Sequence, residues 1–454
     1  MEGRTLGQIE RKRGTSMESP EFLKSTATKL ERIAWLSSRD TGKVFNNLMH
    51  LFNTESLRDC FHTLDGKKAV GIDGIRKEEY GENLDGNLQD LIARMKRMAY
   101  RPGPVREVLI PKPDKPNATR TLGISNLEDK LVQKMMQKIL ESIYEPMFLD
   151  CSYGFRPGRG PHDAIRALRS YLYRHEVEVV IDLDISNFFG TVGHYELDAI
   201  LKEKITDKRF IRYIHRMFKA GVLRDNELTI SDQGVVQGSM CSPVLSNIYA
   251  HYVLDDWFEK VVKKHCKGKV ELFRFCDDAV VCCQHKSDAE RIKRALSKRL
   301  EKYNLQLNED KTHSVNFAIR QQRQNNKQGT FEFLGFTFYL GKSRQGAIIP
   351  KVKTSRKRLR SKLKAVTIWI RENRNRMRLM QLWKLVQAKI RGHIQYYGVS
   401  FNFAGISQFV HECRRILFKW LNRRSQRKSF NWEKFQLFVE RNPLPPLKIC
   451  HKLF

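Results

Sequence analysis

Two apolar stretches in the middle of the chain each contain aspartates. EVVIDLDI (178–185) is a β-branched run that carries Asp182 and Asp184, and ELFRFCDDAVVCCQ (271–284) contains the neighbouring pair Asp277-Asp278. An unpaired carboxylate in an apolar environment costs several kcal/mol, so these aspartates need a cation. We expect 178–185 to be a strand and 271–284 to be two short strands that meet at the aspartate pair.

Three carboxylates presented at one edge of a sheet form an oxygen-rich site of the kind that Mg²⁺ prefers. Two such ions, roughly 3.5–4 Å apart, can activate a hydroxyl and stabilise a leaving group in phosphoryl transfer. Asp184, Asp277 and Asp278 are the expected ligands, and Asp182 is expected to be structural. A second pair, Asp255-Asp256, lies in a polar helical stretch and is expected to be solvated.

The segments between these strands favour helices, so the middle of the chain is expected to be α+β, with helices packed on one face of a sheet. FEFLGFTFYL (331–340) alternates aromatic and small residues as a hairpin strand does. REVLIPKPDKPNATRTLGI (106–124) reads as two strands joined by a turn rich in Pro and Lys.

The net charge of +33, with 83 Lys and Arg against 50 Asp and Glu, favours a polyanionic partner. Nucleic acid is the first expectation, and an anionic membrane surface is the alternative. No apolar stretch approaches the roughly 18 residues of a membrane span, and the first residues lack an apolar signal core, so we expect a cytoplasmic protein (bacterial cytosol or nucleoid) without a membrane partner. The nine cysteines show no Cys-x-x-Cys pair, which favours reduced thiols over a zinc site.

The final quarter of the chain is strongly basic. Residues 341–454 hold 28 Lys and Arg but four acidic residues, a net charge of +24. Apolar residues recur there at helical spacing, which predicts three helices with apolar inner faces and basic outer faces. A merely solvated surface would mix the two signs of charge, so we expect nucleic acid to bind this region, with Arg356, Lys357, Arg358 and Arg360 among the contacts.

Eight collinear motifs resemble those of group II intron-encoded reverse transcriptases, also called maturases. They cover about residues 43–454 and read AVGIDGI (69–75), IPKPDKPNATRTLGI (110–124), DCSYGFRPGRGPHDAI (150–165), DLDISNFFGTVGH (182–194), GVVQGSMCSPVLSNIYAHYVLD (234–255), RFCDD (274–278), NLQLNEDKT (304–312) and FEFLGF (331–336). The resemblance implies a right-hand polymerase fold, with fingers and palm followed by an all-α thumb or maturase domain.

The resemblance also implies domain boundaries. We expect a basic, partly disordered extension (1–42), an N-terminal and fingers region (43–175) and a palm with part of the fingers (176–340). A helical thumb (341–422) and a basic tail like the family's DNA-binding segment (423–454) would follow. No endonuclease module is expected after Phe454, so target cleavage would come from intron RNA or a host nick.

Roles are implied for matching residues. Asp184, Asp277 and Asp278 would be the catalytic carboxylates, with the Ile185 carbonyl as a further ligand for two Mg²⁺ ions, which Mn²⁺ could replace. Phe189 would be a steric gate beneath the nucleotide sugar, although by composition alone it reads as core. The implied nucleotide-binding residues are Lys112, Arg120, Phe189, Gln237 and Lys311, of which Lys112 and Arg120 could equally be surface charges. Gly238 would lie against the template, and Leu334-Gly335 would support the primer end.

Four positions depart from the family pattern: Val236 replaces a proline, Phe275 a tyrosine, Cys276 an alanine, and Gly190 a common acid. None is a metal ligand, so activity is expected. The implied partners are an RNA template, group II intron RNA, a DNA primer or target and deoxynucleoside triphosphates, with no obligate protein partner evident. Two alternatives stay open: a domesticated polymerase acting in DNA repair or phage defence, and a non-catalytic RNA-binding splicing factor.

Overall fold

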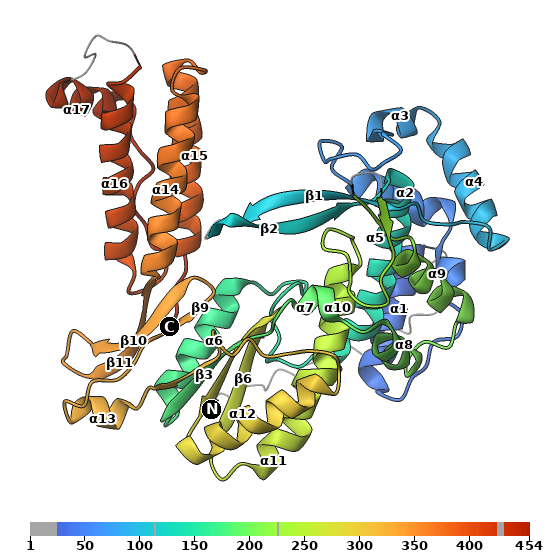
Figure 1. The fold of residues 1–454 in the computed structure, drawn as a ribbon, viewed down its shortest axis with the longest axis horizontal. Coiled ribbons are helices and arrows are strands. Elements are labelled where there is room, and N and C mark those ends of the chain that lie inside the picture. The colour runs from blue at the N-terminus through green and yellow to red at the C-terminus, as the bar shows by residue number, and fades with distance from the viewer. Residues whose placement is uncertain (1–24, 113–114, 225–226, 425–430) are drawn as a thin grey trace, which may run out of the picture.

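A four-stranded antiparallel sheet lies at the centre of the computed structural model, which describes residues 25–112, 115–224, 227–424 and 431–454 (Figure 1). The strand order is β6-β7-β3-β8. The strands are β3 (Val179–Asp184), β6 (Val270–Phe275), β7 (Asp278–Cys283) and β8 (His313–Asn316). The strand expected at 178–185 and the two strands expected at 271–284 are therefore confirmed.

The central sheet is covered on both faces. Side chains of a strand alternate between faces, and those of β3 and β7 therefore join two different cores. Ile181 and Val281 pack with helices α10 and α12, whereas Val180 and Val280 pack with α6 and a second sheet. The expectation of helices on one face was incomplete, because the partners of the second face come from distant segments. The three helices are α6 (Pro161–Arg174), α10 (Ser242–Ala250) and α12 (Lys286–Glu301).

The second sheet has the order β11-β10-β9 and is antiparallel. Its strands are β9 (Phe331–Phe333), β10 (Phe336–Lys342) and β11 (Ile348–Thr354). The expected change of character at residue 341 falls inside β10, and β11 was missed. Pro350 and three lysines in or near β11 hid the strand, because such residues are typical of sheet edges rather than of central strands.

The last part of the chain forms a helical bundle that projects away from the central sheet (Figure 1). Its helices are α14 (Arg356–Asn373), α15 (Leu379–Tyr397), α16 (Phe403–Leu421) and α17 (Trp432–Arg441). The expected apolar faces meet in one core, where Trp383, Ile390 and Leu417 are at most 1% exposed. Phe435 of α17 is fully buried in the same core, so this part of the expected separate tail packs on the bundle.

The N-terminal helices pack around α5 (Leu127–Tyr144). Residues 1–42 were expected to be a loosely attached extension, but α1 (Thr26–Arg39) packs against α5, and the Ser37 hydroxyl donates to the Ile143 carbonyl at 2.5 Å. Residues 1–24 lie outside the described residues. The helices around α5 include α2 (Thr54–Thr63), α4 (Leu84–Lys96), η2 (Glu145–Met147), α8 (His194–Lys202) and α9 (Lys208–Lys219).

A long hairpin extends from these helices toward the C-terminal bundle (Figure 1). It consists of β1 (Val105–Lys112) and β2 (Lys115–Ile124), as the sequence predicts for 106–124, and belongs to a sheet of order β2-β1-β4-β5. The remaining elements are η1 (Met49–Leu51), α3 (Lys77–Glu82), α7 (Phe188–Thr191), β4 (Val222–Arg224), β5 (Glu227–Thr229), η3 (His251–Asp255), η4 (Phe258–Val262), α11 (Lys263–His265) and α13 (Ile319–Arg323). The elements η3 and η4 are π-helical stretches in a helix that runs on from α10.

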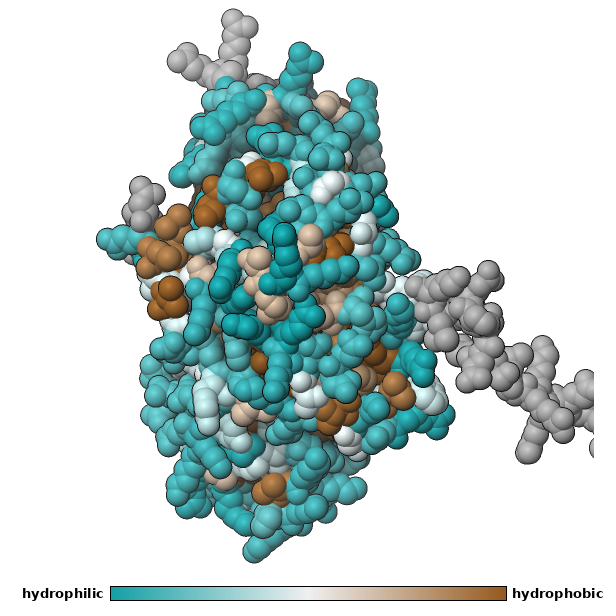
Figure 2. Space-filling view, turned by 90° about the vertical axis from the view of Figure 1, so that its right-hand side faces the viewer, coloured by the Kyte–Doolittle hydropathy of each residue, from teal (hydrophilic) through white to brown (hydrophobic). Residues whose placement is uncertain are grey.

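The surface on the side of the N-terminal helices is mostly hydrophilic, with small separate hydrophobic areas (Figure 2). Within the described ranges, no helix is long and apolar enough to cross a membrane.

Candidate active site

The pairing of β3 with β7 brings the aspartates together. Asp184 ends β3, Asp278 begins β7, and the two are directly opposed in the antiparallel register. Directly opposed residues have Cβ atoms roughly 4.5–5.5 Å apart and project from the same face. That face also carries Val180 and Val280, so both carboxylates lie on the side of the second sheet. The observed register thus places two expected ligands, which come from two separated motifs, next to each other.

Asp277 lies in the tight turn between β6 and β7. Cys276, the first residue of this turn, has a φ of 60°, in the left-handed region that non-glycine residues seldom adopt. The backbone of Gly154 lies so close that a Cβ at Gly154 would be 2.5 Å from the Cys276 amide nitrogen. The backbone of Gly154 therefore packs against the turn, in addition to the pairing of β6 with β7.

The three aspartates repel one another. Partial desolvation, followed by the charges of Asp277 and Asp184, raises the pKa of Asp278 to about 6, although this side chain is exposed at the end of its strand. Desolvation and the charge of Asp184 also raise the pKa of Asp277. Asp182, on the same face of β3, has its pKa raised to about 7 by desolvation and then by Asp278 and Asp184. The chain therefore supplies less positive charge than these carboxylates require.

Lys311 supplies part of that charge. Its ammonium group donates to both carboxylate oxygens of Asp184, at 2.9 and 2.7 Å. The segment that carries Lys311 also pairs with the end of β3: the amide of Asn308 donates to the Asp184 carbonyl at 2.8 Å, and Ile185 forms a bridge with Leu307. We expected Lys311 near a triphosphate; the structure places its ammonium group on the carboxylate of Asp184, and the triphosphate contact stays a prediction.

A cavity of about 870 Å³ opens in front of the turn. It brings together six residues of the predicted site, namely Phe189, Asp277, Asp278, Leu334, Gly335 and Arg358. The C-terminal bundle supplies much of the opposite wall, including Trp369, Lys389 and His393. Residues more than 200 positions apart in sequence thus meet around the aspartates.

The other predicted residues lie elsewhere. Gln237 lines a separate cavity of about 260 Å³ with Asn187 and Gly190, and Gly238, at φ 111°, packs against the Gly123 carbonyl of β2. Arg120 is exposed on β2, and the side chain of Lys112 lies outside the described residues. Arg356, Lys357 and Arg360 are exposed on α14. The motif residues therefore form neighbouring sites rather than one pocket.

The turn between β9 and β10 is fixed by the C-terminal bundle. Leu334 and Gly335 have φ values of 50° and 79°. The Tyr396 hydroxyl donates to the Leu334 carbonyl at 2.9 Å, and a Cβ at Gly335 would be 3.0 Å from the Tyr397 hydroxyl. The turn expected to support a primer is thus tied to α15.

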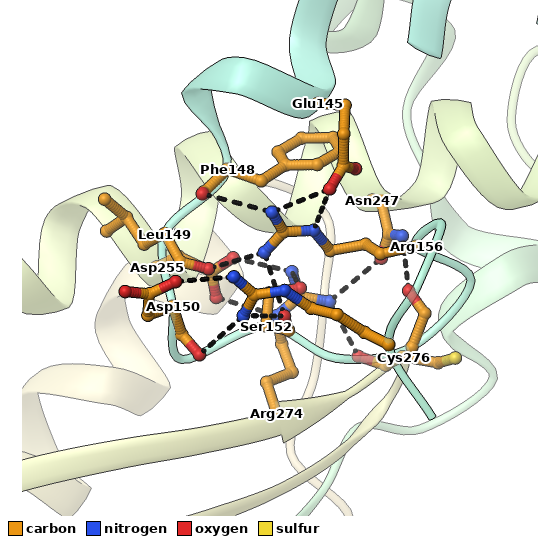
Figure 3. Close-up of polar contacts among 12 residues, drawn as sticks. Glu145, Phe148, Leu149, Asp150, Ser152, Arg156, Asn247, Asp255, Arg274 and Cys276 are labelled. Carbon is orange, nitrogen blue, oxygen red and sulfur yellow. Dashed lines mark hydrogen bonds and ion pairs between the residues drawn. The ribbon is translucent and has the colours of Figure 1, made fainter. Parts of the chain in front are cut away.

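The expectation for Asp255 was wrong. Asp255 is 1% exposed, and the buried guanidinium of Arg274 donates to both of its carboxylate oxygens, at 2.7 and 2.6 Å (Figure 3). The remaining Arg274 donors contact the side chains of Asn247 and Ser152 and the Cys276 carbonyl. Two signals could have revealed this: Asp255 follows an apolar run, and it stands eight residues after Asn247, which places both on one helix face.

The residues at the end of β3 and β7 suit a hard divalent cation. Carboxylate oxygens and a backbone carbonyl are its preferred ligands, and raised pKa values mark carboxylates that lack a positive partner. Among the residues that the structure describes, no three His, Cys, Asp or Glu side chains are already arranged around one metal position. The oxygen atoms at this position suit a divalent cation. In this structure the ammonium group of Lys311 pairs with the carboxylate of Asp184.

Comparison with known proteins connects these motifs to a family. Residues 110–338, which are 229 of 454, match the family described as "Reverse transcriptase (RNA-dependent DNA polymerase)". The chain is 32% identical over 230 residues to the group II intron-encoded protein LtrA of Lactococcus lactis subsp. cremoris, a match that covers 50% of this chain and 38% of that protein. It is 33% identical over 213 residues to protein YkfC of Escherichia coli (strain K12), covering 46% and 54% of the two chains. A third relative, an uncharacterized 91 kDa protein in the cob intron of Schizosaccharomyces pombe, is 33% identical over 215 residues, covering 46% of this chain and 26% of that protein.

These matches span between about a quarter and about half of the relatives' own lengths. The matched region runs from the end of β1 to the start of β10 and includes all three candidate catalytic aspartates. The chain resembles group II intron-encoded proteins, and it belongs to the reverse transcriptase (RNA-dependent DNA polymerase) family.

Proposed function

We propose that this protein is an RNA-directed DNA polymerase that extends a DNA primer on an RNA template and binds group II intron RNA. The observation that carries the proposal is the direct pairing of Asp184 with Asp278, with Asp277 beside them in the turn that faces the large cavity. Family membership supports the same reaction class.

In this proposal the central sheet is the palm, the β1–β2 hairpin with the N-terminal helices forms the fingers, and α14–α16 form the thumb. The arrangement in Figure 1 supports this assignment, because the hairpin and the helical bundle stand on either side of the end of the sheet where the aspartates lie. The expected boundary between palm and thumb then shifts from residue 341 to about residue 355, after β11.

Asp184, Asp277, Asp278 and the Ile185 carbonyl would hold two Mg²⁺ ions, or Mn²⁺ in their place. These ions supply activation of the primer 3′-hydroxyl and stabilisation of the leaving pyrophosphate. The chain's own contribution is to hold these carboxylates partly desolvated and close together, which raises the pKa values of Asp277 and Asp278, a cost that a bound cation relieves. The ammonium group of Lys311 pairs with the carboxylate of Asp184. Because the Lys311 side chain is exposed, it could release Asp184 and bind another anion.

The neighbouring residues orient the substrates. Phe189 lines the cavity with Asp277 and Asp278. Its ring would exclude a 2′-hydroxyl on the sugar of the incoming nucleotide. Lys112 and Arg120 lie on the hairpin, from which basic side chains would hold the triphosphate, and Gln237-Gly238 packs against the base of β2. Leu334-Gly335 would support the primer end.

The basic helical bundle would bind RNA phosphates. Helix α14 contains Arg356, Lys357, Arg358 and Arg360 in its first turns, and the single acidic residue of the helix is Glu372. Such a surface attracts any RNA. Recognition of an intron RNA, with a role in splicing and mobility, rests on the similarity to the group II intron-encoded protein LtrA.

The test is extension of a DNA primer annealed to an RNA template, with deoxynucleotides and Mg²⁺, beside binding of a structured group II intron RNA and an unrelated RNA of equal length. Extension that stops when EDTA is added and preferential intron binding are expected. Extension with equal binding of both RNAs favours the domesticated polymerase. Intron binding by a protein that extends nothing with Mg²⁺ or Mn²⁺ would replace the polymerase with a non-catalytic splicing factor.

A further inference from the structure

An aromatic residue that the motifs did not single out projects into the cavity. Phe155, in the loop between η2 and α6, is 53% exposed and has a φ of 54°. A bulky residue in the left-handed region is strained, and such strain persists only where the surroundings impose it. An exposed phenylalanine contributes little to a core, so the strain is not explained by packing of its own side chain.

Two buried arginines, Arg156 and Arg274, contact the segment that precedes Phe155 (Figure 3). Arg156, whose side chain is 4% exposed, donates to the carbonyls of Leu149 and Ser152 at 2.7 and 2.9 Å and forms an ion pair with Glu145 at 2.8 Å. From the other side, Arg274 donates to the Ser152 hydroxyl at 2.8 Å. Both guanidinium groups therefore donate hydrogen bonds to Ser152, which lies shortly before Phe155 in the chain.

The residue between these anchors is tied to the catalytic turn. The Asn247 side chain donates to the Gly154 carbonyl at 2.6 Å, and Gly154 lies against the Cys276 amide without room for a side chain. Arg274 donates to the Cys276 carbonyl at 3.1 Å. The same hydrogen-bond network therefore fixes Phe155 relative to Asp277.

Phe155 lies beside the expected sugar gate. The ring centroids of Phe155 and Phe189 are 6.4 Å apart, and their planes are inclined at 76°. Both rings line the 870 Å³ cavity together with Asp277 and Asp278. Two rings set edge to face beside the aspartates form an apolar surface with no hydrogen-bonding group of its own.

We propose that Phe155 is a specificity-determining residue, which with Phe189 forms an aromatic surface for the sugar of the nucleotide held at the catalytic turn. The inference rests on the proposed polymerase function. Apolar sugar atoms gain contact with this surface, whereas a 2′-hydroxyl pressed against it loses hydrogen bonds to water without replacement. The surface therefore both improves binding of a deoxynucleotide and disfavours a ribonucleotide.

The experiment measures kcat and KM of the full chain for a deoxynucleotide and for the matching ribonucleotide. Phe155→Ala is expected to raise KM for the deoxynucleotide by about tenfold and to lower the preference for it over the ribonucleotide by a similar factor, since losing apolar contact in a pocket typically costs one to two orders of magnitude. Phe155→Leu, which keeps apolar bulk, should fall between the wild type and Phe155→Ala. Because the rings are in contact, the effects of Phe155→Ala and Phe189→Ala should not add in the double variant.

The control is Tyr195→Ala, which removes an aromatic side chain that is 84% exposed and does not line this cavity. It should leave both KM values unchanged, and Phe155→Ala and Tyr195→Ala should unfold at the wild-type temperature or above, because both side chains are exposed. Unchanged KM and unchanged sugar preference in an active Phe155→Ala protein would overturn the proposal and leave the polymerase function standing. A wild-type protein that extends no primer would overturn both.

Discussion

The chain contains two pairs of consecutive aspartates, Asp255-Asp256 and Asp277-Asp278. They differ in whether basic side chains of the protein form ion pairs with them. On the helix after α10, the carboxylate of Asp255 is buried against the guanidinium of Arg274, and Asp256 forms an ion pair with Lys260 at 2.8 Å. In the turn between β6 and β7, Asp277 and Asp278 face an open cavity and repel each other and Asp184.

Under the proposed function, this difference separates a structural charge from a functional one. A buried carboxylate whose cation comes from the chain itself completes a fixed network, whereas one without enough internal positive charge has a raised pKa and attracts a cation from outside. The bundle shows the converse, since the first turns of α14 expose several cations with few acids nearby in sequence. Each imbalance of charge predicts a ligand: a divalent cation at Asp277 and Asp278, and nucleic acid at the first turns of α14.

The largest expected effect is at the turn. Asp277→Asn or Asp184→Asn should reduce primer extension by roughly a thousandfold or more, because metal positioning carries most of this chemistry. Asp277→Asn should not lower the unfolding temperature, since it removes a repelling, partly desolvated charge from the cluster. Extension at near the wild-type rate would show that these aspartates are not the catalytic carboxylates.

The second effect tests the paired carboxylate. Asp255→Asn leaves the buried Arg274 without its anion and should lower the free energy of unfolding by about 3–5 kcal/mol. Its neighbour is the matched control: Asp256→Asn removes a partly exposed i,i+4 pair and should change stability by less than about 0.5 kcal/mol. Equal losses measured by urea unfolding would remove the contrast between these two positions.

A smaller effect concerns a buried group that is neutral. His393 is 6% exposed and stacks on Phe409 at 3.5 Å between ring centroids, and burial lowers its pKa to about 3. The unfolded chain binds a proton near pH 6.5 and the folded chain does not, so stability is full above about pH 6.5 and falls as the pH drops toward 3. Between pH 7 and pH 5, the free energy of unfolding of His393→Phe should therefore fall by about 2 kcal/mol less than that of the wild type, as measured by urea unfolding. Identical losses in both proteins would mean that His393 becomes charged in the folded state.

The smallest effect is expected on the basic bundle. Replacing Arg356, Lys357 and Arg360 with Gln, while keeping Arg358 because it lines the cavity, should weaken RNA binding and flatten its dependence on salt. Each lost phosphate contact changes the slope of log K against log salt by roughly 0.7–0.9. The control replaces Arg291, Arg294 and Lys298 of α12, which covers the sheet face away from the cavity. Equal slopes for the two triple variants in filter binding would show that α14 is ordinary solvated surface.

Features that depend on local sequence patterns could be predicted, whereas features that depend on contacts between distant segments could not. The strands that carry Asp184 and Asp278 and the apolar faces of α14 to α16 have local periodic patterns, and their prediction holds. The motif order also identifies the family. The partnership of Asp255 with Arg274, the second cover of the sheet and the contact of Phe155 with Phe189 join distant segments, and no local pattern encodes such a meeting. The packing of α1 was missed because a polar, basic stretch resembles a flexible extension.

The π-helical stretch His251–Asp255 makes the Arg274 pair sensitive to the length of the chain as well as to its composition. A π-helix hydrogen-bonds to the fifth residue along, so the stretch accommodates a residue that a regular α-helix would not hold at that span. Deleting one residue there would let the helix close into regular α form, and the positions on either side would keep facing nearly the same way. A deletion between Asn247 and Ala250, in the regular α part, has no extra residue to absorb and would turn Asn247 by about 100° relative to Asp255. A deletion scan of this helix should therefore preserve the Arg274 contacts when a residue is removed within 251–254 and break them when one is removed just before, a distinction that substitution scanning does not sample.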